Sequence, residues 1–178
     1  HEGLGEAVAN AIAEHYLPKF AGDKVPSCPT ACAVALADRL DTLTGIFGIG
    51  QMPSGSKDPF ALRRASIGVL QIILQNQLAI NIKDWINNAC HLHAELADPL
   101  ATEEKVFDYL LDRFAALYQD QGLATEVFSA VKAKRPEQPL DFDARVQAVA
   151  AFIKTPESNN LANANKRVNN ILAKSELR

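Results

Sequence analysis

Residues 30–47 of the chain, TACAVALADRLDTLTGIF, decide the fold of the molecule. Their apolar side chains recur every three or four positions: Ala33, Leu36, Leu40, Leu43 and Phe47. Because an α-helix turns once in about 3.6 residues, this spacing places all five on one helix face. Thr30 stands where a side-chain oxygen can cap the first turn. The stretch therefore predicts a helix that buries one face in a core.

The same period recurs on both sides of this stretch, in segments that are bounded by proline, glycine or capping residues. We predict further helices over residues 6–16, 59–74, 84–97, 102–121, 126–134, 142–153 and 160–174. In the last of these, Leu161, Val168 and Ile171 are expected to face inward. No segment alternates convincingly with the period of two that a half-buried strand needs. The predicted fold class is all-α, a multi-helix bundle of about eight helices.

The composition is that of an ordinary globular protein, but the charges are unevenly distributed. The 178 residues include 48% apolar and 22% charged side chains, and the formal net charge is −3. Residues 1–131 carry nine basic and sixteen acidic side chains, whereas residues 132–178 carry nine basic and five acidic ones. A protein that binds nucleic acid through an overall basic surface is thereby excluded. A local anion-binding face is not excluded.

The ends of the chain and its cysteines favour a cytoplasmic protein. No basic start followed by an apolar block marks a signal peptide, and no apolar run approaches the roughly 20 residues of a membrane span, so we expect no membrane partner. Cys28, Cys32 and Cys90 lack the second Cys or His pair of a zinc site, and we expect free thiols. Because the first residue is His1 and not Met, we expect a piece of a longer chain.

A glycine-rich segment, residues 48–59 with the sequence GIGQMPSGSKDP, follows the opening stretch. Together with Gly45 we expect it to form an irregular loop, after which Asp58 caps a helix whose first residue is Pro59. The free N–H groups of that helix start, together with Lys57, make a candidate phosphate site. The competing interpretation is a capped turn between helices, because the Asp58 carboxylate stands where the phosphate would lie.

Two histidines and an aspartate resemble part of the pattern of the HD-domain superfamily of metal-dependent phosphohydrolases. Asp38 matches the closing aspartate of that pattern, and His1 and His15 precede it in the chain. A metal held by these side chains could activate water. In one straight helix, however, His1 and His15 would lie about 21 Å apart, so a shared metal needs a break at Gly3 and Gly5. We predict no metal site, and the alternative is a site of His1, His15 and Asp38.

Two further pairs of polar residues lie in predicted helices. Lys166 and Arg167 stand beside asparagines, and this combination can contact phosphate and sugar. The competing interpretation is a solvated helix face. His91 and His93 are two residues apart, roughly 200° around a helix axis, and cannot face one metal together. We expect both histidines to be ordinary helix residues.

Several motifs resemble one family. In chain order they are LADRLDTL at residues 36–43, GIFGIG at 45–50, GSKDPFALRR at 55–64, RP at 135–136, DFDAR at 141–145, ANKRV at 164–168 and NIL at 170–172. These motifs, above all the long central block, resemble the bacterial glycyl-tRNA synthetase β subunit. The resemblance implies an enzyme of two α and two β subunits that joins glycine to tRNA(Gly) with ATP and Mg²⁺. It also implies that the α subunit holds the class II catalytic core, whereas the β subunit mainly binds tRNA.

The resemblance further implies how the chain is divided. Residues 1–121 correspond to an HD-like helical domain, and residues 122–178 to a helical extension that leads toward an anticodon-binding domain outside this chain. We expect no catalytic residue and no cofactor in the piece itself. Its expected role is to bind tRNA or to support the subunit structurally. The residues expected to contact tRNA are Lys57, Arg63, Arg64, Lys166 and Arg167.

Among these cations, Arg63 and Arg64 have different expected surroundings. Arg63 shares a helix face with apolar residues such as Ile67 and Leu70, which favours a structural role, whereas Arg64 faces Gln71 and is the better RNA candidate. Two other functions stay open. One is an active metal-dependent phosphohydrolase of the HD type. The other is a structural spacer that positions the anticodon-binding domain.

Overall fold

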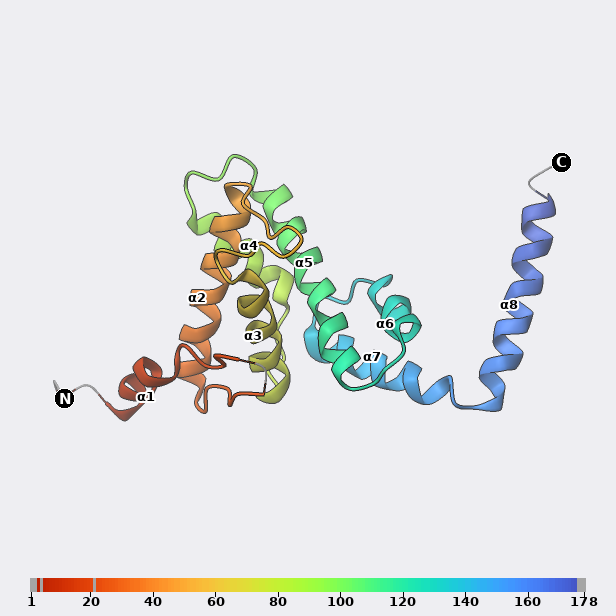
Figure 1. Ribbon diagram of the computed structural model, residues 1–178, viewed down its shortest axis with the longest axis horizontal. Helices are drawn as coiled ribbons and strands as arrows, with labels where there is room; N and C mark the ends of the chain where they lie inside the picture. Colours follow the sequence, from red (N-terminus) through yellow and green to blue (C-terminus); the bar gives the residue numbers. More distant parts are fainter. Residues whose placement is uncertain (1–2, 4, 21, 176–178) are drawn as a thin grey trace.

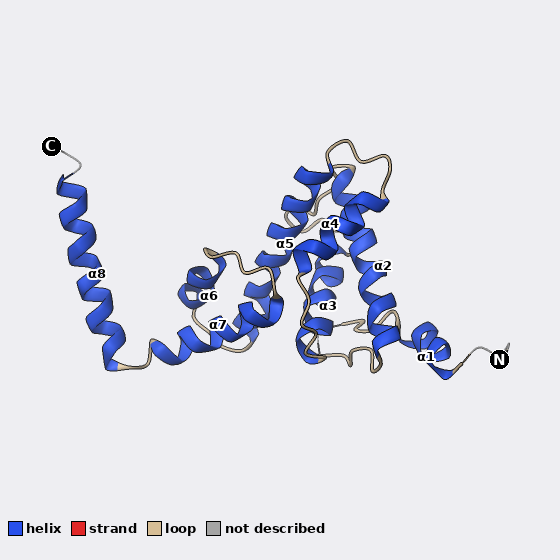
Figure 2. Cartoon of the chain, turned by 180° about the vertical axis from the view of Figure 1, so that it is seen from behind, coloured by secondary structure: helices blue, strands red, loops and turns tan. Residues whose placement is uncertain are grey.

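The computed structural model describes residue 3, residues 5–20 and residues 22–175, and these residues form eight helices and no strand (Figures 1 and 2). In chain order the helices are α1 (Glu6–Glu14), α2 (Pro29–Gly48), α3 (Leu62–Gln75), α4 (Ile82–Leu92), α5 (Pro99–Asp120), α6 (Thr125–Lys132), α7 (Pro139–Phe152) and α8 (Pro156–Ser175). The prediction of an all-α fold of about eight helices is confirmed. None of the described helices combines the length and the apolar character needed to cross a membrane.

Helix α2 packs against α1, α3, α4 and α5 and carries much of the core. Four of its five predicted core residues are at most 3% exposed: Leu36, Leu40, Leu43 and Phe47. Ala33 is instead exposed and lines a hollow between α2 and α4. The 3.6-residue period therefore correctly predicted the buried face of this helix, except for Ala33 near its start.

Two glycines that were predicted to lie in the loop belong to helix α2. The helix continues through Gly45 and Gly48 before it ends. A Cβ atom on Gly45 would come within 3.2 Å of the His93 ring, and one on Gly48 would overlap the Leu96 side chain. Glycine is tolerated inside this helix because it lets the α4–α5 connection pack closely on α2.

Each helix from α2 to α8 starts at a residue other than the one predicted, and α4, α6, α7 and α8 start one to four residues earlier. Helix α2 starts at Pro29 and not after a Thr30 cap, α3 starts at Leu62 and not at Pro59, and α5 starts at Pro99 and not at Thr102. Proline suits the first position of α2 and α5, since the N–H group it lacks would have no helical partner there. In α5 the Asp98 carboxylate accepts a hydrogen bond from the N–H of Ala101 at 2.9 Å. Helix α4 ends at Leu92, before the predicted residue 97.

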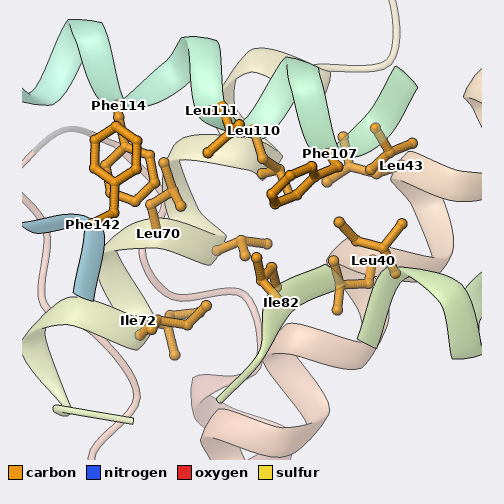
Figure 3. Close-up of a cluster of buried hydrophobic side chains, with 14 of the residues drawn as sticks. Leu40, Leu43, Leu70, Ile72, Ile82, Phe107, Leu110, Leu111, Phe114 and Phe142 are labelled. Carbon is orange, nitrogen blue, oxygen red and sulfur yellow. The ribbon is translucent and has the colours of Figure 1, made fainter. Parts of the chain in front are cut away.

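The hydrophobic core extends from the α2–α5 bundle into α6 and α7. Phe114 of α5 and Phe142 of α7 stack with their ring centroids 4.2 Å apart (Figure 3), and Tyr118 continues the stack 5.9 Å from Phe114. The Tyr118 hydroxyl donates to the Asp143 carboxylate at 2.9 Å, so the polar atom of this buried ring has a partner. One core thus continues past residue 121, where the predicted division into two units falls.

Helix α8 stands apart from the rest of the molecule (Figures 1 and 2). Every side chain from residue 159 to residue 174 is exposed. Leu161, Val168 and Ile171 are 60%, 52% and 66% exposed, so the prediction that they face inward is wrong. Their spacing correctly indicated a helix, but no described helix lies against this face to cover it.

Candidate nucleic-acid interface

The loop between α2 and α3 places Asp58 at the start of α3. Its carboxylate accepts hydrogen bonds from the N–H groups of Leu62 and Arg63 at 2.8 and 3.0 Å. Ala61, with a left-handed φ of 54°, makes the turn that leads into the helix. The N–H groups that would bind a phosphate already donate to the Asp58 carboxylate. A phosphate therefore has no free donors at this helix start.

The three predicted cations of this region have different surroundings. Lys57 ends a turn that begins at Ser54, and it is exposed. Arg63 is half-buried and donates to the carbonyl oxygen of Gly55, so it holds the loop against α3. Arg64 is exposed, and neither Lys57 nor Arg64 has a carboxylate partner among the described residues. Arg64 is thus more exposed than Arg63, and its contact with RNA stays a prediction.

Residues 16–20, between α1 and α2, lie against the start of α3 and form a groove with it. The groove consists of two adjacent surface hollows of about 510 and 560 Å³. We call it the aromatic–basic groove and define it by Tyr16, Lys19, Phe20, Phe60 and Arg64. Lys19 and Arg64 line both hollows, Tyr16 and Phe60 line the first, and Phe20 lines the second together with Arg63 and Gln71.

The groove presents aromatic rings and positive charge to solvent. Tyr16, Phe20 and Phe60 are 63%, 64% and 41% exposed, although large aromatic side chains gain free energy from burial. Both side chains, the Lys19 ammonium and the Arg64 guanidinium, are exposed and form no ion pair with a described carboxylate. Asp38 is the one carboxylate among the described residues that line either hollow. Aromatic faces beside unpaired cations are typical of surfaces that bind nucleic acid.

Arg39 holds the outer wall of the groove in place. Its guanidinium, 8% exposed, donates to the carbonyl oxygens of His15, Tyr16 and Leu17 at 3.0, 3.1 and 2.8 Å, as well as to that of Ala35 at 2.9 Å. Burial lowers the pKa of Arg39 below its usual range, although nearby Asp38 acts in the opposite direction. Because its donors are engaged with the backbone, Arg39 is a structural residue of the groove and not a free cation.

Sequence reasoning missed Tyr16, Lys19, Phe20 and Phe60. The one local signal was the run YLPKF at residues 16–20, in which two aromatic residues flank a lysine. Phe60 and Arg64 lie about forty residues away in the chain, and only the packing of α2 between these segments brings them together. A search for clustered residues in the sequence therefore cannot find the complete groove.

The alternative metal ligands show no described site. His1 lies outside the described residues. The Nδ1 atom of His15 is 2.8 Å from the carbonyl oxygen of Ile12, and Asp38 is exposed on α2. Within residues 5–20 and 22–175, no group of three His, Cys, Asp or Glu side chains is placed to hold a metal ion.

His93 has a contact that the sequence analysis did not predict. It follows the last residue of α4, and its Nε2 atom lies 3.2 Å from the Asp41 carboxylate and 3.1 Å from the Thr44 hydroxyl, both on α2. His91 faces elsewhere, with its Nδ1 atom 2.8 Å from the carbonyl oxygen of Asn87. The two histidines are thus separate, as expected, but His93 links the end of α4 to α2 instead of lying within a helix.

Part of the positive charge of the C-terminal section is neutralised by α5. Lys132 pairs with Asp112, and Arg135 pairs with both Glu104 and Asp108. These cations stand at or just after the end of α6, where the helix dipole favours positive charge, and the carboxylates of α5 are their partners. Lys166 and Arg167 on α8 are exposed and have no carboxylate partner among the described residues.

The five cations predicted to contact tRNA do not form one surface. Arg63 and Arg64 line the same hollow, and Lys57 lies in the loop before them. Lys166 and Arg167 lie on α8, which stands at the other side of the molecule from α1 and α3 (Figure 1). The structure therefore offers two separate basic regions, one at the groove and one on α8.

Known proteins with similar sequences were found for nearly the whole chain. The glycine–tRNA ligase beta subunit of Shewanella amazonensis is 55% identical over 176 residues, which cover 98% of this chain and 25% of that protein. The corresponding subunits of Klebsiella pneumoniae and Shewanella baltica are 52% and 54% identical and cover 99% and 98% of the chain. The chain thus spans about a quarter of the length of the curated relatives it matches.

A family model gives the same result. The model of the family described as glycyl-tRNA synthetase beta subunit matches residues 1–133, which is most of the chain. The match contains the central motif block, the groove and helices α1 to α6. The chain therefore belongs to the glycyl-tRNA synthetase beta subunit family.

Proposed function

We propose that the chain supplies a tRNA-contacting helical segment to a glycyl-tRNA synthetase beta subunit, and so supports the ATP-dependent joining of glycine to tRNA(Gly). The observation that carries this proposal, given the family, is the set of unpaired cations beside the start of α3, namely Lys19, Lys57 and Arg64. Unpaired exposed cations can contact phosphates and release counterions from the RNA, which provides most of the sequence-independent binding energy. Lys166 and Arg167 form a second proposed contact on α8.

The proposed assembly contains two alpha and two beta subunits. In it the alpha subunit binds ATP and Mg²⁺ and carries out the chemical steps. The chain contributes RNA binding and the position of neighbouring parts, and we assign no catalytic group to it. Its buried core gives the cations near α3 a rigid support, which lowers the entropic cost of placing them against phosphates.

Measurement of tRNA binding at several salt concentrations, with the complete synthetase carrying this chain, tests the proposal. Arg64→Gln removes an unpaired cation and should weaken binding and reduce the slope of log K against log salt by about one. Arg145→Gln is the matched control, because Arg145 is exposed but already paired with Asp141 at 2.8 Å. It should leave the salt slope unchanged. The proposed contact would be contradicted if the salt slope stayed at the wild-type value in all three variants Lys19→Gln, Lys57→Gln and Arg64→Gln.

A further inference from the structure

We propose that the aromatic–basic groove holds unpaired nucleotides of RNA, with bases stacked on its aromatic rings and a backbone phosphate against Lys19 and Arg64. This inference rests on the proposed tRNA-binding function, and it adds which structural class of RNA the groove recognises. It concerns the groove alone and not the second basic region on α8.

The order of the lining residues matches the order of groups along a single strand. Tyr16 and Phe60 line the first hollow, Phe20 lines the second, and Lys19 and Arg64 line both. An aromatic surface is therefore followed by two cations and then by a second aromatic surface. A single-stranded RNA presents base, phosphate and base in the same order. The bases of a duplex cannot stack on the two aromatic surfaces, because their faces are already stacked inside the double helix.

The exposure of the rings leaves them accessible to a partner. Tyr16, Phe20 and Phe60 keep 41–64% of their surface in solvent. Elsewhere in the same chain, Phe107, Phe114 and Phe142 are at most 2% exposed, whereas Phe152 is 41% exposed but has no place in the groove. Nucleobases provide flat π-faces of any sequence, and stacking on such rings is the usual way in which proteins hold them.

The wall that carries two of these rings is fixed before any RNA binds. Arg39 ties the carbonyl oxygens of residues 15–17 to α2, and Gly68 of α3 leaves room for its guanidinium, since a Cβ there would lie 2.8 Å from Nε. The Asp23 carboxylate accepts a hydrogen bond from the Lys19 N–H at 2.8 Å. Leu17 and Pro18 are buried, so the side chains on either side of them face outward. Little conformational entropy then remains to be lost on binding.

Polar groups inside the hollows favour bases over a second phosphate or an acidic peptide. Asp38 lines the first hollow, where its carboxylate would repel a phosphate but can accept a hydrogen bond from a base amino group. Gln71 lines the second hollow, and its amide can pair with a base edge. The carboxylates of an acidic peptide would match Lys19 and Arg64 equally well, but they lack the large flat π-face with which a base stacks on an aromatic ring.

Fluorescence anisotropy with the 178-residue chain at low salt tests the proposal. The probes are a labelled unstructured RNA of about ten nucleotides, a labelled blunt-ended RNA duplex of about ten base pairs, and a labelled polyglutamate peptide. We expect the unstructured RNA to bind about tenfold more tightly than the duplex. Phe60→Leu and Phe20→Leu should each weaken binding of the unstructured RNA by about tenfold and change duplex binding less than twofold.

The control variant is Phe152→Leu, because Phe152 has the same 41% exposure as Phe60 but lies at the end of α7. It should bind all probes as the wild type does, and thermal melts followed by circular dichroism should show that each variant is folded. The proposal would be overturned if the single strand and the duplex bound equally, if polyglutamate bound as tightly as RNA, or if no RNA binding were measurable. Wild-type binding by folded Phe60→Leu and Phe20→Leu would overturn it as well. The salt slope of Arg64→Gln with whole tRNA tests the proposed tRNA binding separately from these measurements. A reduced salt slope together with wild-type binding by Phe60→Leu and Phe20→Leu would mean that the chain binds tRNA without base stacking in the groove.

Discussion

Helices α2 and α8 have the same length of 20 residues and both begin at a proline, yet their surroundings are opposite. Helix α2 has nine buried residues and packs against four other helices. Helix α8 has an apolar stripe at helical spacing, but all of its side chains from residue 159 to 174 are exposed. The comparison shows that apolar periodicity predicts a helix, but does not predict whether the apolar face finds a partner within the chain.

The two helices are therefore stabilised by different interactions. Complete burial of a leucine contributes roughly 1.5–3 kcal/mol, and Leu36, Leu40 and Leu43 of α2 are at most 3% exposed. Helix α8 depends on its own backbone hydrogen bonds, which make an isolated helix only marginally stable in water. Four measurements compare the packed helices, α2 and its neighbour α5, with α8, in decreasing order of the expected difference.

The largest difference is expected in amide hydrogen exchange. Amides in the middle of α2 should exchange only when the whole molecule unfolds, which requires about 5–15 kcal/mol in a typical domain. Amides of α8 should exchange through local opening at a cost of about 1 kcal/mol or less. Exchange followed by mass spectrometry of peptides from each helix measures both values. Equal protection of the two helices would mean that the apolar face of α8 is covered in solution.

The second difference concerns truncation of an apolar side chain. Phe114→Ala removes a ring that is 2% exposed and stacked on Phe142, and should lower the free energy of unfolding by about 3–5 kcal/mol. Val168→Ala on α8 should change it by less than about 0.5 kcal/mol, since this side chain is 52% exposed. Urea denaturation of both variants gives the two values. A cost above 1 kcal/mol for Val168→Ala would show that α8 packs against something.

The third comparison uses two arginines. Arg39→Met should cost about 1–3 kcal/mol, because the carbonyl oxygens of residues 15–17 then lose a buried donor. Arg167→Met on α8 loses no described partner and should be nearly neutral. Denaturation gives the stability, and limited proteolysis should reveal earlier cleavage near residues 15–20 in Arg39→Met only. Unchanged proteolysis there would contradict the role of Arg39 in holding the groove wall.

The smallest effect is expected for surface charges and depends on pH. The hydrogen bond and charge of Lys83, with a further contribution from Arg135, lower the pKa of Glu104 below its ordinary value of 4.5. Because the unfolded state binds this proton more readily, the stabilisation is present above pH 4.5 and is lost as the pH falls through the lower folded-state pKa. Glu104→Gln should cost about 0.5–1 kcal/mol at pH 7 and flatten the acid part of the stability profile.

Glu157→Gln, in the first turn of α8, is the control for this measurement, since Glu157 has no described cationic partner. Thermal melts between pH 3 and pH 7 record both profiles. A Glu104→Gln profile that follows the wild type through the acid range would remove Glu104 as a cause of acid sensitivity.

The interactions near the candidate site are of two kinds, those between residues close in the chain and those between residues far apart. The pairing of Arg63 with the Gly55 carbonyl, and of Asp58 with the first N–H groups of α3, is local and follows from the loop sequence. The hydrogen bonds from Arg39 to the carbonyl oxygens of residues 15–17 join residues more than twenty positions apart, and no sequence pattern in either segment predicts them. The glycines at 45 and 48 also looked like loop residues, because the side chains that pack on them belong to the segment after α4.

The sequence alone determined the all-α fold class, the buried face of α2, the family resemblance and the candidate cations, because helical periodicity and motifs are local properties of a chain. The tertiary structure alone decided which cations are unpaired, that α8 is uncovered, and that Tyr16, Phe20 and Phe60 meet Lys19 and Arg64 in one groove. These properties depend on long-range packing, in which a side chain's environment is made by residues that are distant in sequence.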